Sequence, residues 1–436
     1  MSQLLITGGC VIDPAQKLFD VPADILLGDG KILALDDRTP ARAAQMQAAL
    51  AAAATVEKFS AAGQTLTPGL IDMHVHFREP GAESEETIAS GAAAAIAGGF
   101  TTVACMPNTE PAIDSEADIN FIYREAHAAQ MAEVLAVGAI TAGRASERLA
   151  EMANMARGGA VAFSDDGRAV GPAALLRQAL LYAKMLGKPL LEHCEEPSLA
   201  AGGVMNEGEV ATELGLPGIP AEAEEIIVAR DLLLVKLTGA RLHLQHISTR
   251  GAVAMLRAAK NAGLPVTAEV TPHHLTLTDA NLRTFNPVYK VNPPLRSAAD
   301  VAACVAALAD GTIDAIASDH APHLQEEKEV EMAQAPFGLL GLETAFGVVY
   351  THLVATGKIP LARVIEAMTT APAKILGCER GTLAVGAKAN LTIWDLTREW
   401  TVNPAEFKSK SKNCPWNGQK LCGKPAAVFV GGERKL

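Results

Sequence analysis

Eight strand-like segments alternate with helix-like segments between about residues 65 and 320, and this alternation constrains the fold more than any other feature. Most of the segments between them are rich in Ala and Leu and amphipathic, as in residues 86–97 and 172–186. Such alternation is typical of a (β/α)8 barrel of the TIM type, in which the C-terminal ends of the strands carry the chemistry. The predicted strands are Leu70–Phe77, Thr101–Met106, Val134–Ala139, Ala160–Ser164, Pro189–His193, Arg241–His246, Pro265–Val270 and Asp314–Ser318.

The two ends of the chain differ from the barrel segment. Residues 1–64 and 379–436 contain short strand-like runs separated by glycine turns, and we expect them to pair into one small β domain flanking a barrel of residues 65–378. Residues 41–54 are rich in alanine and predict a helix, inserted locally in the first of these segments. The predicted strands are Leu4–Thr7, Val11–Ile12, Asp24–Leu27, Lys31–Leu35, Ala389–Asp395 and Ala426–Val430, and further helices are expected at 341–355 and 361–376.

Composition excludes several classes of function. The chain has 436 residues, of which 49% are hydrophobic, so it can bury a large core. Its net charge of −12 argues against nucleic acid or an anionic membrane as a partner. The seven cysteines are scattered without a Cys-x-x-Cys pair, and the N-terminus lacks the pattern of a signal peptide. We therefore expect a cytoplasmic protein with reduced thiols.

A His-x-His pair stands at the end of the first predicted barrel strand. Residues i and i+2 of a strand point to the same side, so His74 and His76 can bring two imidazoles to one point. Imidazole is a common zinc ligand, although His-x-His alone is a weak signal. Four more strand ends carry ligand-type residues, namely the Asp165-Asp166 pair, His193, His246 and Asp319. Together they suffice for two divalent ions that share a bridging carboxylate.

The sequence leaves several assignments open. Asp165 and Asp166 alternate along the chain, and periodicity does not choose between them. His243 and His246 differ by three positions, so on a regular strand only one points inward; we expect His246 to do so and His243 to face outward. Taken singly, each inner histidine is as easily a hydrogen-bonded core residue as a ligand, whereas five strand ends together favour a metal site.

Eight segments resemble motifs of the dihydroorotases, in particular the long bacterial type, within the amidohydrolase superfamily. Asp72–Gly81 is similar to the metal and substrate motif of that family almost letter for letter, and the resemblance covers nearly the whole chain. The other motifs that carry it are Ala104–Thr109, Phe163–Gly167, Lys290–Arg296, Ser318–His323 and, shared more widely among amidohydrolases, Thr370–Gly377 with Gly381–Leu383 and Ala389–Thr392.

The resemblance implies a ligand set. His74, His76 and Asp319 match the ligands of one metal, and His193 and His246 match those of the other. The bridging aspartate is the second of its pair in the family, which corresponds to Asp166. One or two zinc ions are implied, although Mn²⁺ or Co²⁺ would fit the same ligands.

The resemblance also implies an activity, the reversible cyclisation of N-carbamoyl-L-aspartate to L-dihydroorotate in the de novo synthesis of UMP. A hydroxide generated at the metal would attack the ring amide, with Asp319 as the general acid and base. The residues expected to bind substrate are His76, Arg78, Asn108 and His323, and for the ring amide Asn292, Phe337 and Gly338. The charged segment 324–336 would be a mobile lid or, alternatively, a solvated loop.

Three other interpretations compete with this one. Hydantoinase-like and allantoinase-like relatives use a carboxylated lysine as the metal bridge, and the segment Phe163–Gly167 contains no lysine. A silent homologue that only scaffolds aspartate transcarbamoylase would have lost metal ligands, whereas every ligand position is filled here. A purely structural barrel would not need four histidines at one rim. A homodimer and an active complex with aspartate transcarbamoylase are both compatible with the resemblance.

Overall fold

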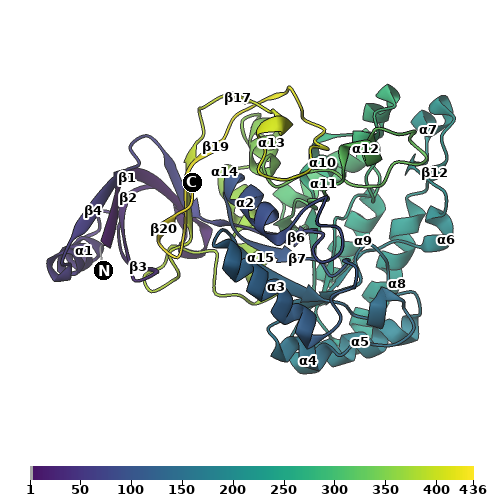
Figure 1. The fold of residues 1–436 in the computed structure, drawn as a ribbon, viewed down its shortest axis with the longest axis horizontal. Coiled ribbons are helices and arrows are strands. Elements are labelled where there is room, and N and C mark those ends of the chain that lie inside the picture. The colour runs from purple at the N-terminus through teal and green to yellow at the C-terminus, as the bar shows by residue number, and fades with distance from the viewer. Residues whose placement is uncertain (1–2) are drawn as a thin grey trace.

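The computed structural model describes residues 3–436, which form a parallel barrel with a separate sheet at one side (Figure 1). The barrel sheet has eight strands in the order β15-β14-β13-β10-β9-β8-β7-β6. A parallel bridge between Val75 and His320 brings its two ends together, and the His76 amide donates to the His320 carbonyl at 2.9 Å. The strands are β6 (Leu70–Val75), β7 (Phe100–Cys105), β8 (Glu133–Gly138), β9 (Ala162–Ser164), β10 (Leu190–Glu192), β13 (Leu242–Leu244), β14 (Val266–Val270) and β15 (Ala315–Ile316). The predicted (β/α)8 barrel is confirmed.

Helices surround these strands, as expected for parallel strands that are buried on both sides. The helices are α2 (Ile88–Ala97), α3 (Glu116–Ala129), α4 (Met152–Arg157), α5 (Ala173–Leu186), α8 (Glu222–Thr238), α9 (Arg250–Asn261), α10 (Pro272–Thr276), α11 (Ala298–Ala309), α12 (Gln325–Lys328) and α13 (Ala345–Val349). The connection between β10 and α8 also contains α6 (Pro197–Ala200), β11 (Met205–Asn206), α7 (Glu209–Leu214) and β12 (Gly218–Ile219), which the sequence did not predict.

The second sheet joins the two ends of the chain in the order β20-β19-β16-β5-β1-β2-β3, with β4 also paired to β1. The predicted strands Leu4–Thr7 and Val11–Ile12 form one strand, β1. It continues through a register shift at Gly8, whose φ of +79° suits glycine. The alanine-rich helix is present as α1 (Pro40–Ala52) and packs through Met46 on this sheet. The strands are β1 (Gln3–Asp13), β2 (Leu18–Gly28), β3 (Lys31–Asp36), β4 (Val56–Ser60), β5 (Thr65–Pro68), β16 (Leu391–Asp395), β19 (Lys424–Val430) and β20 (Glu433–Arg434), and a hairpin of β17 (Trp400–Thr401) and β18 (Lys420–Leu421) lies apart.

Trp394 connects the two sheets. Its indole Nε1 donates to Thr67 Oγ1 at 2.9 Å, and its ring stacks on Phe346 with centroids 3.8 Å apart. On its barrel side the ring lies so close to Gly99 that a Cβ there would be 2.3 Å from it. The strand β5 pairs in the terminal sheet, so this sheet extends past residue 64, and the division of the chain near residues 64 and 378 stays a prediction.

The predicted helix over 361–376 is two helices, α14 (Leu361–Met368) and α15 (Thr370–Leu376). The chain breaks at Thr369, which has φ −136° and ψ −78°. Pro372 explains the break, because a proline in a continuous helix would clash with the carbonyl of Met368. The helix expected over 341–355 continues past α13 as a π-helical turn at Tyr350–Val354.

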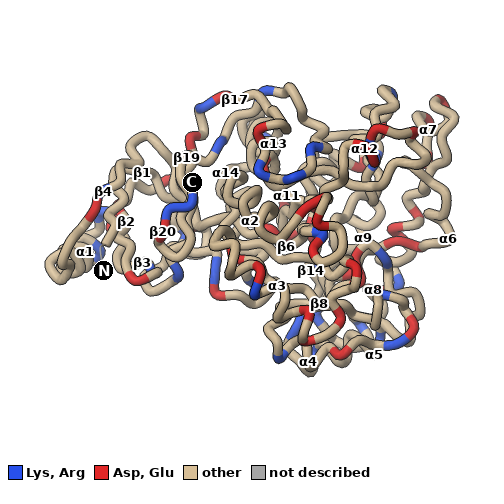
Figure 2. The backbone as a smooth tube through the Cα atoms, viewed as in Figure 1, with Lys and Arg blue, Asp and Glu red and all other residues tan. Residues whose placement is uncertain are grey.

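Acidic and basic residues are interspersed along the backbone of both parts (Figure 2). Among residues 3–436, no helix combines the length and the apolar character that a membrane crossing requires.

Candidate metal centre and active site

Asp166 lies at the centre of the ligand-type side chains. It follows β9 by two residues, and its Oδ1 atom is 3.3 Å from His74 Nε2, 3.5 Å from His246 Nε2 and 3.6 Å from His193 Nδ1. Its Oδ2 atom is 3.5 Å from His76 Nε2. All five side chains are buried. The structure thus brings the four predicted histidines around one carboxylate at the C-terminal ends of the barrel strands.

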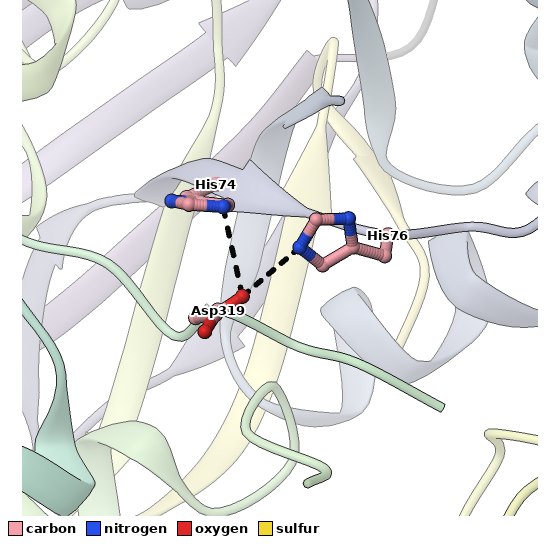
Figure 3. A group of neighbouring side chains, drawn as sticks. All are labelled: His74, His76 and Asp319. Atoms are coloured by element: carbon pink, nitrogen blue, oxygen red, sulfur yellow. Dashed lines mark hydrogen bonds and ion pairs between the residues drawn. The ribbon is translucent and has the colours of Figure 1, made fainter. Parts of the chain in front are cut away.

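Asp319 approaches the same group from the end of β15 (Figure 3). Its Oδ1 atom is 3.0 Å from His76 Nε2 and 3.6 Å from His74 Nε2. Asp319 and His246 have φ angles of +48° and +31°, which non-glycine residues rarely adopt. Backbone strain of this kind clusters at functional sites. Here it occurs at the two residues that bring their side chains to this group, His246 beside Asp166 and Asp319 beside His74 and His76.

The backbone distinguishes the two neighbouring aspartates. Asp165 Oδ1 accepts hydrogen bonds from the amides of Ile140 and Thr141 at 2.8 and 3.0 Å, so this carboxylate joins two loops. Asp166 instead faces the histidines. The choice of Asp166, which the resemblance implied, agrees with this geometry.

His243 was predicted on the outer face, and that prediction is wrong. Its ring is buried, with Nε2 3.2 Å from Glu269 Oε2 and Nδ1 2.8 Å from Thr267 Oγ1. The strand β13 ends at Leu244, so strict alternation does not extend to His246, and both rings point inward at different depths.

Glu269 is a functional candidate that the sequence analysis missed. Its Oε1 atom is 2.6 Å from His74 Nδ1, and its side chain is almost fully buried. A carboxylate on Nδ1 keeps the proton there and leaves Nε2 free to bind a cation. The available signal was a charged residue in the interior of the strand β14, where a buried barrel strand normally carries apolar residues.

Four buried atoms of this group have no hydrogen-bond partner among the described residues. Two of them, His74 Nε2 and Asp166 Oδ1, face each other at 3.3 Å, whereas His193 Nε2 and His246 Nδ1 are the ring nitrogens that do not face Asp166. Buried polar atoms are normally satisfied, because an unpaired one costs about 1–3 kcal/mol. Two triads, His74-His76-Asp319 and His74-Asp166-His246, have ligand atoms within 4.8 Å of one another. The residues therefore fit a divalent cation.

The electrostatics favour positive charge at the centre. Burial opposes ionisation of Asp166, but His74, His193 and His246 outweigh it and hold the pKa of Asp166 well below its usual range. Burial also disfavours a charged His193, yet Asp166 and Glu195 raise the pKa of His193 to about 10. A divalent cation would supply the same positive charge to the carboxylates, and it would favour neutral imidazoles as its ligands.

A cavity of about 230 Å³ opens beside this centre. It is lined by the predicted substrate residues together with the candidate ligands, namely His76, Arg78, Asn108, Asp166, His193, His246, Asn292, Asp319, His323, Phe337 and Gly338. His74 lies behind them, fully buried. The buried Oδ1 atom of Asn292 is unpaired among the described residues, as expected of a group that awaits a ligand. Asn108 has a second contact, because its Oδ1 atom is 2.8 Å from His76 Nδ1.

Arg78 is positioned at the mouth of this cavity. Its Nε donates to the Pro322 carbonyl at 3.1 Å and lies 3.2 Å from Glu85 Oε2, and its Nη2 is 3.2 Å from His323 Nε2. Glu85 was not predicted, and it also lies 3.3 Å from His323 Nδ1. One carboxylate thus contacts both cationic-type residues that were expected to bind the substrate carboxylate.

The segment 324–336 is packed on the barrel, which argues against a purely solvated loop. Lys328 is buried, and its ammonium group donates to the carbonyls of Pro336 and Gly338 at 2.8 and 2.9 Å. Lys290 donates to the Met332 carbonyl at 2.7 Å. The amide of Gly338 in turn donates to Lys290. Motion of this segment as a lid stays a prediction.

A larger cavity of about 620 Å³ lies at the opposite end of the barrel, among the N-terminal ends of β10, β13 and β14. None of its lining side chains has a buried polar atom without a partner among the described residues. In barrels of this kind the chemistry lies at the C-terminal end. We therefore assign the candidate site to the smaller cavity.

Comparison with known proteins agrees with the geometry. Residues 63–252 match the family described as Dihydro-orotase-like. A dihydroorotase of Pelotomaculum thermopropionicum is 52% identical over 99% of this chain and 98% of its own length, and one of Citrifermentans bemidjiense is 48% identical over the same shares.

Among solved structures, an L-hydantoinase (dihydropyrimidinase) from Arthrobacter aurescens aligns with a TM-score of 0.86 and 27% identity, covering 100% of this chain and 96% of that one. A D-hydantoinase from Thermus sp. aligns with a TM-score of 0.82 and 24% identity over 99% of this chain and 95% of that one, which supports the fold alone. The two relatives that match this chain over nearly its whole length are therefore both named dihydroorotase. The two hydantoinase structures align with the whole fold of this chain. The chain belongs to the dihydroorotase family.

Proposed function

We infer that the protein is a dihydroorotase, a cyclic amide hydrolase that interconverts N-carbamoyl-L-aspartate and L-dihydroorotate in de novo pyrimidine synthesis. The observation that carries this inference is the contact of Asp166 with four histidines beside a cavity that also holds Arg78 and Asp319. A cation site next to a guanidinium suits a cyclic amide that bears a free carboxylate.

The centre is proposed to hold one or two zinc ions, with Mn²⁺ or Co²⁺ as alternatives. His74, His76 and Asp319 would bind one ion, His193 and His246 the other, and Asp166 would bridge them. The buried and unpaired atoms His74 Nε2 and Asp166 Oδ1, which face each other, support this assignment. When bound, the metal lowers the pKa of water towards neutrality and polarises a carbonyl oxygen.

Asp319 is the proposed catalytic residue. Burial would raise its pKa, but the histidines around it lower that pKa strongly, so the carboxylate is ionised at neutral pH and can accept a proton. In the hydrolytic direction it would take a proton from the attacking water and deliver it to the leaving amide nitrogen. In the cyclising direction the same group would act in reverse, taking the proton of the closing ureido nitrogen.

Substrate binding is proposed to divide between two sides of the cavity. Arg78, Asn108 and His323 would hold the free carboxylate, to which the planar guanidinium can present two parallel N–H donors. Asn292 and the backbone of Phe337 and Gly338 would face the ring amide. His76 would contact both the cation and the substrate. Because the Gly338 amide and carbonyl are already bonded within the protein, Asn292 is the stronger candidate for the ring contact.

Hydrolysis of a hydantoin is a second candidate function, favoured by the fold match to the L-hydantoinase at 27% identity. Arg78 argues against it, since an unsubstituted hydantoin ring has no carboxylate for that residue to bind. Purified protein loaded with zinc should hydrolyse L-dihydroorotate and leave hydantoin and dihydrouracil unchanged. Turnover of hydantoin in preference to dihydroorotate would overturn the inference. Asp319→Asn should abolish turnover, whereas Asp310→Asn, an exposed control, should not.

We further propose a cytoplasmic location, which the seven free cysteines support. A homodimer and a complex with aspartate transcarbamoylase are proposals about partners. Size-exclusion chromatography of the pure protein, alone and with that enzyme, would test both.

A further inference from the structure

Exposed apolar side chains are concentrated on one side of the barrel. Of the twelve large hydrophobic residues that the described structure exposes, six lie on α5, α6 and α8. The most exposed are Met185 at 82%, Leu233 at 67% and Leu237 at 65%. Figure 1 places these three helices on the side of the barrel away from the terminal sheet. The full set is Leu181, Met185, Leu199, Ile226, Leu233 and Leu237, which we call the α8 surface.

The α8 surface is continuous along the helix α8. Ile226, Leu233 and Leu237 are seven and four residues apart, so they form one stripe. Leu199 joins its first half, because α6 meets α8 through the Glu196 amide and the Ala223 carbonyl at 2.8 Å. Leu181 and Met185 join its last turn, where the neighbouring Lys184 donates to the Thr238 carbonyl at 2.8 Å.

Arg230 would interrupt this stripe if it extended into solvent. Instead its guanidinium turns inward, where Nε donates to Asp231 at 2.7 Å and Nη1 donates to the carbonyls of Val170 and Gly171 at 2.8 and 2.9 Å. The centre of the stripe is therefore left without a free charge. Contiguous apolar surface of this kind marks interaction sites on soluble proteins.

Charge along α8 is divided by sign. Its first turn carries Glu222, and its last turn carries Lys236, both exposed. Glu222 and Lys236 lie on the same flank of the apolar stripe, because their separation of fourteen residues is close to four helical turns. If two α8 helices pack antiparallel about a two-fold axis, Glu222 of each meets Lys236 of the other, and Ile226 lies opposite Leu233. The surface is thus complementary to itself.

We propose that the α8 surface is the interface of a homodimer, with α8 packed antiparallel against the α8 of a second copy of this chain. The inference rests on the homodimer proposed above and adds its surface and register. A hetero-partner would not require the acidic and basic ends of one helix to match each other, whereas an isologous dimer does. Neither Glu222 nor Lys236 lines the candidate active site.

The test measures the dimer dissociation constant of the zinc-loaded full chain by sedimentation velocity. We expect wild type to be dimeric at micromolar concentration. Leu233→Glu with Leu237→Glu should weaken the dimer by about 100-fold or more, since central apolar contacts dominate interfaces. Phe19→Glu, an equally drastic change at an exposed residue of the terminal sheet, should leave the constant unchanged.

Charge reversal gives the sharper test of register. Glu222→Lys alone and Lys236→Glu alone should each raise the dissociation constant by about tenfold, because each makes two like-charged contacts per dimer. The double reversal should restore the wild-type value. A monomeric wild type, an unaffected leucine variant or a double reversal that fails to restore dimerisation would each overturn the proposal. Dihydroorotate turnover in the same samples distinguishes this failure from failure of the proposed activity.

Discussion

Glu269→Gln should weaken metal binding although Glu269 is not one of the proposed ligands. The side chain keeps its shape but loses its charge at a contact of 2.6 Å with His74 Nδ1. Burial would raise the pKa of Glu269, but His74 and His243 outweigh it and lower that pKa to about 2, so the carboxylate is ionised throughout the working range. An ionised acceptor raises the basicity of the ring and thereby strengthens the bond from Nε2 to a cation.

The size of the effect follows from that contact. Hydrogen bonds to charged partners contribute about 1.5–3 kcal/mol, roughly twice as much as neutral ones, so the substitution should cost about 1–2 kcal/mol of metal binding. Each 1.4 kcal/mol is about tenfold, which predicts zinc binding about 5- to 30-fold weaker. Glu269→Ala should cost more, because the imidazole N–H then also loses its partner in a buried place.

The assay is competition for zinc against a chromophoric chelator, with Glu366→Gln as an exposed control. Circular dichroism of the metal-free variants checks that each one folds. Zinc affinity of Glu269→Gln equal to that of wild type, in a folded protein, would refute the role given to this carboxylate. A loss of activity with unchanged affinity would refute it equally, since the predicted route to lower activity is weaker binding.

Three further predictions concern the cavity and the fold. Arg78→Met should raise the KM for dihydroorotate by about 10- to 100-fold in steady-state assays, because the substrate carboxylate loses a charge-assisted partner, and an unchanged KM would exclude Arg78 from binding it. Burial raises the pKa of Glu343 to about 7, so the folded state holds a proton that the unfolded carboxyl releases above its ordinary pKa of 4.5. The free energy of unfolding should therefore fall as pH rises from 4.5 towards 7. Glu343→Gln should increase this free energy by about 1–3 kcal/mol above pH 7 but not below pH 4. Urea titration at both pH values measures the difference. Gly99→Ala should lower that free energy by about 2–3 kcal/mol, since its φ is +89° and its Cβ would approach the Trp394 ring to 2.3 Å, and an unchanged urea midpoint would contradict the packing described at the junction of the two sheets.

The barrel could be predicted because its strands are buried on both sides and are therefore mainly apolar in sequence, with helix-like segments between them. All eight strands are present, with ends that differ by a few residues. The sequence pattern predicted less where the backbone bends within an element. The glycine turn expected between the strands Leu4–Thr7 and Val11–Ile12 is a bulge at Gly8 within β1, and Thr369 breaks a helix that the hydrophobic pattern alone continues. The short elements between α6 and α8 have too few residues to show a period.

The candidate ligands could be predicted because they follow strand ends, which meet at one rim in such a barrel. His243 was misplaced, because alternation was carried past Leu244, where the strand ends. Periodicity could not separate Asp165 from Asp166, since the two differ in loop contacts that depend on distant residues such as Ile140. Glu269 and Glu85 act through other side chains, and no spacing rule links either of them to its partner.

The proposed metal-dependent activity is tested by dihydroorotate hydrolysis with metal-free protein to which zinc is added stepwise, bound zinc being measured on the same samples. We predict no turnover in the metal-free protein and turnover that rises with bound zinc until one or two ions per chain are held. Full turnover without metal, or zinc bound at this stoichiometry without any turnover of dihydroorotate, would show that the protein is not a metal-dependent dihydroorotase.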